Sequence, residues 1–394
     1  MFVAILSTIL LLLALSEWHI WRTILHGRSA RLRGIYYLIS ALCTLPYLLI
    51  WAAGHIWDIF SPIATTISQI SIILLLINAT LKILHAAGSL LAGWFSKRNI
   101  ALLFDLLALA VVGVILYGHL WERKQLRTTE IELLYPNLPD GANGVKIVQF
   151  GDLHIGLGRG RYAMLEKVAE RVNEIGADIV VDCGDITNSR YTELDSTAMQ
   201  ILSRIKAPLG VYTVIGNHDN GMYIRDTVAI PREENIRLLM ERQRSMGWHN
   251  ITDTTIPIAI GGDTLYLSAI DYPKQIKKGA HGVEVGDDYS HHFADLPDGA
   301  FNIVLAHTPV VWSNILAACE AELTLSGHVH SMQLKLPLGE RGWSPAALIY
   351  EHWSGLYHNG LCALNITDGV GSSLPMRVGV KPEIVVITLR KSAK

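Results

Sequence analysis

Residues 145–154 read Val-Lys-Ile-Val-Gln-Phe-Gly-Asp-Leu-His, a short apolar run that ends in a glycine and two potential metal ligands. Similar endings recur as Gly-Asp at 184–185, Gly-Asn-His-Asp at 216–219, Ala-His at 306–307 and Gly-His-Val-His at 327–330. Each motif follows an apolar, strand-like run. Because open α/β sheets place their sites at the carboxyl ends of strands, the five motifs predict one shared site.

The segments around these motifs predict an α/β domain. We expect strands at 145–150, 178–183 and 211–215, and helices at 161–175, 194–205 and 232–246. This alternation is typical of βαβ units. Beyond residue 248 we expect short strands near 256–260, 264–269, 302–306 and 322–326, a helix near 310–318, and β-rich segments near 346–351, 361–366 and 383–389. The order of elements predicts two sheets with helices on the outside.

The first third of the 394-residue chain has a different composition. Half of all residues are hydrophobic and only 17% are charged, and the apolar excess lies in residues 1–121. A helix needs about 20 apolar residues to cross a bilayer. We therefore predict transmembrane helices at about 1–21, 35–57, 64–92 and 100–121, a connector at 122–144 and a globular domain at 145–394. The alternative is that the first run is a cleaved signal peptide, but it lacks a basic n-region.

Charged residues inside and between the predicted spans bear on function and orientation. Intramembrane charges often mark functional sites, but we favour a plainer account in which Lys82 snorkels to the interface and Asp105 lies near its helix end. The basic residues of the first and third loops are Arg22, Arg28, Arg31, Arg33, Lys97 and Arg98, against Arg123, Lys124 and Arg127 after the last span. The positive-inside rule then predicts a membrane protein whose globular domain is extracytoplasmic.

Charge and cysteine content exclude some classes of function. The net charge of −2 and the absence of a basic block in the globular part argue against a nucleic-acid partner. The four cysteines follow no disulfide or zinc-ribbon spacing.

The motifs supply the ligand types of a two-metal hydrolytic site. The candidate ligands are Asp152, His154, Asp185, Asn217, His307, His328 and His330. In extended backbone, residues i and i+2 point the same way, so Asp152 and His154 can meet one cation. The mixed nitrogen and oxygen set suits Mn, Fe, Zn or Co, and two such ions would activate a bridging water for in-line attack at phosphorus. We expect His218 to be the general acid and Asp219 to orient it.

With these motifs, residues 143–390 resemble the calcineurin-like metallophosphoesterases. The ending Pro382-Glu383-Ile384 followed by Val-Val-Ile-Thr-Leu is most similar to their bacterial membrane-associated phosphodiesterase branch. The resemblance implies a four-layer α/β/β/α sandwich and a di-metal phosphoesterase. It also implies one metal held by Asp152, His154 and His330, a second held by Asn217, His307 and His328, Asp185 between the two, and His218 acting on the leaving group or the phosphate.

One departure from that branch follows the last motif. Ser331 and Met332 stand where the branch has two glycines, so we expect larger side chains on a pocket wall beside the ligands.

These observations predict a membrane-anchored phosphodiesterase. Anchoring would place the site near the bilayer, which favours a lipid-linked or cell-envelope phosphoester as the substrate. Two alternatives remain: hydrolysis of a UDP-linked diacylglucosamine, which some similar proteins perform at a cytoplasmic site, and a membrane sensor that binds a metal or ligand without turnover. Against the sensor, every ligand position and His218 are present.

Overall fold

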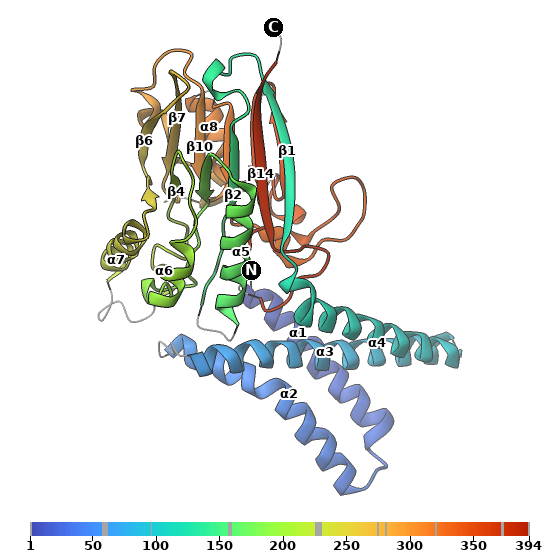
Figure 1. The fold of residues 1–394 in the computed structure, drawn as a ribbon. Coiled ribbons are helices and arrows are strands. Elements are labelled where there is room, and N and C mark those ends of the chain that lie inside the picture. Colours follow the sequence, from blue (N-terminus) through green and yellow to red (C-terminus); the bar gives the residue numbers. More distant parts are fainter. Residues whose placement is uncertain are drawn as a thin grey trace. The chain divides into compact units, whose positions relative to one another are not determined.

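The computed structural model divides the chain into two compact units, residues 1–121 and 122–394 (Figure 1). It describes residues 2–56, 62–95, 97–156, 160–224, 231–273, 276–279, 282–319, 321–371 and 374–392. Met1, Trp57 and Lys394, which end predicted segments, lie outside the described residues.

The first unit is built from four long helices, as the apolar runs predict. They are α1 (Phe2–Ile20), α2 (Ala30–Ile56), α3 (Pro62–Phe95) and α4 (Arg98–Leu120). All four are long and apolar enough to cross a membrane. A π-helical turn, Trp21–Leu25, continues α1. Helix α3 packs against each of the other three and is therefore the centre of this unit.

A buried polar cluster joins three of these helices and corrects the expectation for Lys82. The Lys82 ammonium is buried in an ion pair with Glu17 of α1, and it donates a hydrogen bond to Ser40 Oγ of α2 at 2.6 Å. The Tyr36 hydroxyl donates to Glu17 Oε2 at 2.8 Å. The Lys82 side chain therefore pairs with a carboxylate on a neighbouring helix instead of reaching for the interface as expected. We call Glu17, Tyr36, Ser40 and Lys82 the membrane cluster.

Asp105 also differs from its expected setting. It lies seven residues into α4, which is about two helical turns from the helix start. One of its carboxylate oxygens is 2.8 Å from His85 Nδ1 of α3. Asp105 is therefore held by a neighbouring helix rather than placed at a helix end.

The second unit contains two six-stranded sheets among its described residues. The order of the first sheet is β1 (Arg127–Tyr135), β14 (Glu383–Lys391), β2 (Lys146–Phe150), β3 (Ile179–Asp182), β4 (Val211–Thr213) and β5 (His249–Asn250). The order of the second is β12 (Gly355–Asn359), β13 (Cys362–Ile366), β11 (Leu323–Ser326), β10 (Asn302–Ala306), β7 (Asp263–Ile270) and β6 (Thr254–Ile260). A separate hairpin pairs β8 (Ile276–Gly279) with β9 (Gly282–Val285).

The two sheets pack face to face with helices on their outer faces, which confirms the four-layer sandwich (Figure 1). Side chains of β2 alternate between cores, as a strand requires. Ile147 points into the core between the sheets, whereas Val148 and Phe150 face the helices of the first sheet. Those helices are α5 (Arg161–Ile175), α6 (Ser196–Leu202) and α7 (Arg232–Ser245). Helix α8 (Trp312–Ala318) contributes to the core outside the second sheet.

Two predicted segments are corrected by the structure. The stretch 122–144 is not only a connector, because β1 lies in it and pairs in parallel with β14 over nine residues, 127–135. Turn residues occupy only its end. The stretch 346–351 is not a strand: Pro345–Leu348 forms a 3₁₀ helix, and the Ser344 hydroxyl caps it by accepting a hydrogen bond from the Ala346 backbone N–H. Proline suits the first position of such a helix because it has no N–H to satisfy.

Candidate functional site

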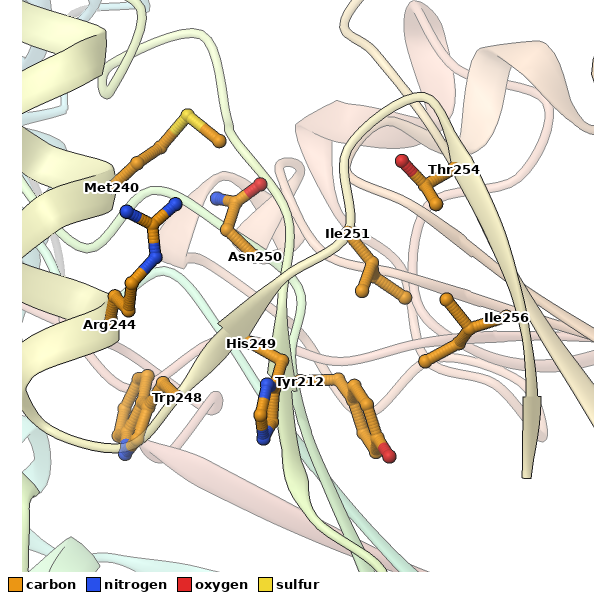
Figure 2. A pocket seen from close by; sticks show the side chains of 9 residues that line it. All are labelled: Tyr212, Met240, Arg244, Trp248, His249, Asn250, Ile251, Thr254 and Ile256. Carbon is orange, nitrogen blue, oxygen red and sulfur yellow. The ribbon is translucent and has the colours of Figure 1, made fainter. Parts of the chain in front are cut away.

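The larger of two described cavities is separate from the five motifs. It has a volume of about 330 Å³ and lies at the free edge of the first sheet, beside α7 and β5 (Figure 2). Arg244, Trp248 and His249 are among its lining residues, and none of the residues that line it belongs to a motif. The candidate site must therefore be found from the ligand residues themselves.

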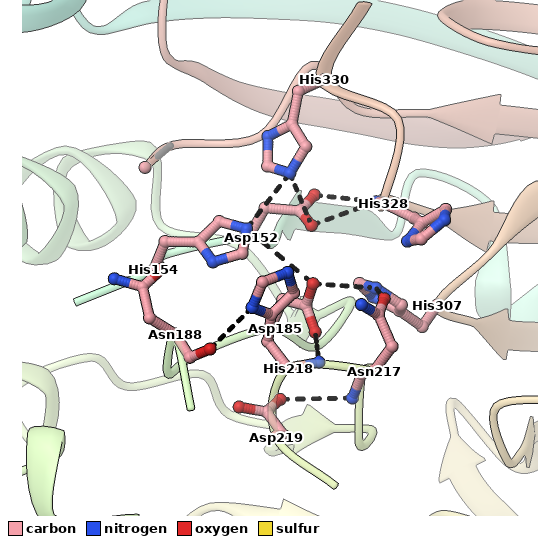
Figure 3. Close-up of polar contacts among 12 residues, drawn as sticks. Asp152, His154, Asp185, Asn188, Asn217, His218, Asp219, His307, His328 and His330 are labelled. Atoms are coloured by element: carbon pink, nitrogen blue, oxygen red, sulfur yellow. Dashed lines mark hydrogen bonds and ion pairs between the residues drawn. The ribbon is translucent and has the colours of Figure 1, made fainter. Parts of the chain in front are cut away.

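All seven predicted ligands lie in one region at the carboxyl ends of β2, β3, β4, β10 and β11 (Figure 3). Ligand atoms of Asp152, His154 and His330 lie within 4.8 Å of one another, and so do those of Asp185, His307 and His328. Strands β2, β3 and β4 are parallel neighbours, and β10 is parallel to β11. The parallel order brings the five motifs to the same end of the sandwich.

The Asp185 carboxylate lies between the two groups of ligands. Its Oδ2 is 3.2 Å from His307 Nε2 and 3.8 Å from His154 Nε2. Its Oδ1 accepts a hydrogen bond from the His218 backbone N–H at 2.8 Å. One carboxylate can therefore serve both groups.

Asn217 completes the second group. Its side-chain Nδ2 donates to the Tyr223 hydroxyl oxygen at 3.1 Å, and its Oδ1 lies 3.1 Å from His307 Nε2. The bond to Tyr223 turns the amide so that its oxygen, the atom that can bind a metal, faces His307.

The backbone at the ligands is left-handed rather than extended, which corrects the reasoning from extended geometry. Asp152, His154, Asp185, His328 and His330 have φ values of 53°, 42°, 58°, 72° and 50°. Strand β2 ends at Phe150, and the following loop is held by hydrogen bonds from the Asp152 N–H to the Gly184 carbonyl at 2.7 Å and from the His154 N–H to the Asp185 carbonyl at 3.0 Å. Such φ values are costly outside glycine and concentrate at functional sites.

Glycines beside the ligands make room for carboxylates. A Cβ atom on Gly216 would collide with the Asp185 carboxylate, and one on Gly327 would collide with that of Asp152. Both glycines are therefore required by close approach as well as by the turns they form.

The donor set fits divalent cations. His154 Nε2 and His330 Nε2 lie 3.2 Å apart, and the buried Nδ1 atoms of both rings have no hydrogen-bond partner within the described part of the chain. His307 Nδ1 donates to the Cys183 carbonyl at 2.7 Å, which leaves its Nε2 facing the oxygens of Asp185 and Asn217. Lone pairs that face one another at these distances are stabilised by a cation between them.

The protonation states of most ligands also suit metal binding. Burial alone would raise the pKa of Asp152, but the charge of His330 and its hydrogen bond hold that pKa at about 2. Burial lowers the pKa of His154 and of His328 to about 3. Metals bind ionised carboxylates and neutral imidazoles. His307 differs, since attraction by Asp185 outweighs burial and raises its pKa to about 10, so a proton competes with a metal there.

His218 lies beside both groups, but Asp219 does not orient it. His218 Nδ1 donates to the Asn188 carbonyl at 2.7 Å, which fixes the ring. The buried Asp219 carboxylate instead accepts hydrogen bonds from the N–H groups of Gly216, Ile186 and Thr187 and from the Thr187 hydroxyl, at 2.9–3.2 Å. Burial, and then the charge of Asp185, raises the pKa of Asp219 to about 7. Asp219 does not orient His218, because its carboxylate is hydrogen-bonded to Gly216 of its own loop and to the loop that follows β3.

Ser331 does not form the predicted pocket wall. It is fully buried, and its hydroxyl donates to Asp368 Oδ1 at 2.5 Å. Ser331 and Met332 have left-handed φ values of 49° and 46°, which glycine would adopt without strain. Met332 packs against a small core that contains Trp353. The larger side chains are therefore used for local packing.

Three tyrosines at the site were not predicted. The Tyr223 ring stacks on His218 with a centroid distance of 4.1 Å. The Tyr272 ring is 5.8 Å from that of His328 and 6.1 Å from that of His307, and the Tyr350 ring meets His328 edge-on at 6.1 Å. We call these three residues the tyrosine wall. The only available signal was that Tyr272 follows a strand end, since none of the three belongs to a spaced motif.

Comparisons with known proteins agree with this geometry. Residues 145–332 match the family model described as calcineurin-like phosphoesterase. A Danio rerio "transmembrane protein with metallophosphoesterase domain" is 30% identical over 293 residues, which is 73% of this chain and 62% of that protein. The metallophosphoesterase YkuE of Bacillus subtilis is 29% identical over 300 residues, which is 72% of this chain and 93% of that protein.

A third relative carries a specific activity in its name. The UDP-2,3-diacylglucosamine pyrophosphatase LpxG of Chlamydia trachomatis is 26% identical over 263 residues, which cover 60% of this chain and 77% of that protein. This chain thus spans less than two thirds of the Danio rerio relative but most of the two bacterial ones. Residues 145–332 of the globular unit, which follows four apolar helices suited to a membrane, are thus similar to the calcineurin-like phosphoesterase domain that these relatives contain.

Proposed function

We propose that this chain is a membrane-anchored, di-metal phosphodiesterase. The position of Asp185 carries the proposal, because its carboxylate faces both His154 of one ligand group and His307 of the other. Two cations that share one carboxylate lie close enough together to act on a single phosphoester.

The residues divide into roles as follows. Asp152, His154 and His330 would hold one ion, Asn217, His307 and His328 the other, and Asp185 both. Mn, Fe, Zn or Co suits this mixture of nitrogen and oxygen donors. Two such ions would supply an activated water for in-line attack and would neutralise charge on the phosphate.

His218 is the proposed general acid for the leaving oxygen. The Asn188 carbonyl accepts a hydrogen bond from the Nδ1–H group of His218. Nε2 is therefore the nitrogen that would exchange a proton with the substrate. The ring lies edge-on to His154 with a centroid distance of 4.7 Å, beside the first ligand group.

The expected location is the inner membrane of a bacterium, with the site outside the cytoplasm. The support is the excess of basic residues in the first and third loops. A site near a bilayer favours a lipid-linked or cell-envelope phosphoester. Alkaline phosphatase and green fluorescent protein fused in turn to the C-terminus test this orientation: phosphatase activity supports it, and bright cytoplasmic fluorescence contradicts it.

The activity is tested with bis(p-nitrophenyl) phosphate and Mn²⁺. We expect turnover by the wild type, almost none by Asp185→Asn, and a large loss in His218→Ala with its metal content retained. His358→Ala, which removes an exposed histidine on β12, is the matched control and should keep full activity. A wild type that holds its metals but shows no turnover would favour the sensor interpretation.

A second candidate activity is hydrolysis of the pyrophosphate bond of UDP-2,3-diacylglucosamine, which the name of the Chlamydia trachomatis relative supports. Release of UMP from that lipid by the wild type, together with a cytoplasmic C-terminus, would favour it over the extracytoplasmic phosphodiesterase.

A further inference from the structure

We propose that the tyrosine wall is the subsite for the second ester group of a phosphodiester, and that it selects monoanionic diesters with a planar, apolar substituent over alkyl diesters and monoesters. The inference rests on the proposed function and names the substrate class of the same site.

Three separate loops bring the wall to one group of ligands. Tyr223 follows the Gly-Asn-His-Asp turn, Tyr272 follows β7, and Tyr350 follows the 3₁₀ helix Pro345–Leu348. The register between β7 and β10 pairs Ile270 with Ala306, which places Tyr272 beside His307. All three rings contact a histidine of the site, so the wall borders the Asn217–His307–His328 group.

The hydroxyls of the wall can bind a phosphate. Tyr223 already accepts a hydrogen bond from Asn217. Tyr272 and Tyr350 are only partly buried, and within the described part of the chain neither hydroxyl has a hydrogen-bond partner. Phenols are neutral at pH 7, since their ordinary pKa is about 10. They can therefore donate to a non-bridging phosphate oxygen without adding positive charge to the site.

The chemistry of the wall favours a diester. A monoester dianion has a third charged oxygen where a diester has an organic group, and tyrosines offer that oxygen no cation. The same faces are good partners for an organic group, because aromatic rings attract planar groups by stacked or edge-to-face contacts. The wall thus matches a phosphate with one negative charge and a flat substituent.

A substrate series with one leaving group tests the proposal. Bis(p-nitrophenyl) phosphate, ethyl p-nitrophenyl phosphate and p-nitrophenyl phosphate all release p-nitrophenolate, but their second group is aryl, alkyl or absent. Within one variant, the ratio of kcat/KM for the first two substrates measures the preference for an aryl group. Comparing this ratio between variants cancels the intrinsic reactivities of the esters.

Removing rings and removing hydroxyls should give different results. We expect Tyr272→Ala and Tyr350→Ala each to lower the aryl-to-ethyl ratio about three- to tenfold, the range of an aromatic contact. Tyr272→Phe and Tyr350→Phe should keep the ratio and lower kcat/KM for both diesters about tenfold, as loss of a hydrogen bond to a charged group does. Tyr266→Ala, within β7 and six residues before Tyr272, is the control and should change neither.

Binding provides a readout that does not require turnover. In Mn²⁺-loaded His218→Ala, calorimetric titration with phenyl methylphosphonate should show weaker binding when Tyr272 and Tyr350 are both replaced by Ala, at equal metal content by mass spectrometry. The Phe variants keep the test valid if the Ala variants do not fold.

Two results would overturn the assignment of the wall: an unchanged aryl-to-ethyl ratio in the double Ala variant, or unchanged affinity for phenyl methylphosphonate. Failure of the wild type to hydrolyse any of the three esters would instead contradict the proposed function, and the titration would then decide the role of the wall alone.

Discussion

The membrane cluster and the ligand group around Asp185 both hold charged side chains that are at least partly buried, but their charges are balanced in different ways. In the membrane cluster, Lys82 pairs with Glu17, and hydroxyls satisfy the remaining oxygens. Around Asp185, carboxylate oxygens and imidazole nitrogens face one another, and among the described residues the Nδ1 atoms of His154 and His330 have no hydrogen-bond partner. The charges of the first cluster are paired within the protein, whereas the second has a set of donors that could hold cations.

The largest expected effect is on catalysis by the ligand group around Asp185. Asp185→Asn removes the charge that serves both ligand groups, so kcat/KM for bis(p-nitrophenyl) phosphate should fall at least about a thousandfold, more than for loss of a single transition-state hydrogen bond. The circular dichroism spectrum should not change, because asparagine keeps the size of the buried side chain and an oxygen that can accept the His218 N–H. Near-normal activity would show that the site does not depend on a shared carboxylate.

Substitutions in the membrane cluster should instead lower the free energy of unfolding. Lys82→Met leaves the partly buried Glu17 carboxylate without its cation, which should destabilise the membrane unit, by at most about 3–5 kcal/mol, the cost for a fully buried pair. Replacing both partners, as Glu17→Leu with Lys82→Met, should cost much less. Thermal unfolding in detergent measures both variants. If the single and double variants unfold alike, the pair does not hold α1 to α3.

A substitution at Gly216 tests how closely the backbone packs against the Asp185 carboxylate. Gly216→Ala places a methyl group against the Asp185 carboxylate, and such overpacking should cost about 1–3 kcal/mol. We also expect metal loss, which mass spectrometry detects. Gly113→Ala, where the added carbon meets no atom within 4 Å, is the control. Normal metal binding by Gly216→Ala would mean that the carboxylate has more room than the structure gives it.

The smallest expected effects come from Ser331 and Met332, which follow the last ligand motif. Ser331→Ala loses the hydrogen bond to buried Asp368 and should cost about 1–3 kcal/mol. Met332→Gly should stay within about 1 kcal/mol of the wild type, because relief of left-handed strain offsets the entropy that glycine adds to the unfolded chain. Denaturant unfolding of the globular unit measures both. The reverse order would contradict the packing role assigned to Ser331.

The same two regions differ in how far their sequence predicted them. The ligands were predictable because each follows an apolar strand, and parallel strands gather their ends at one edge. The left-handed backbone at Asp152 and His328 was not, because it depends on hydrogen bonds between loops that are distant in sequence. Lys82 was misjudged since its partner, Glu17, lies 65 residues away. The tyrosine wall follows no spacing at all, since its members meet only after three loops fold.

The number of metal ions per chain is the most direct test of the central claim. Purified in Mn²⁺ and dialysed, the wild type should retain two ions by mass spectrometry, and His330→Ala and His307→Ala should each retain about one, since they belong to different ligand groups. A wild type that retains no metal, or two variants that each keep both ions, would contradict the account.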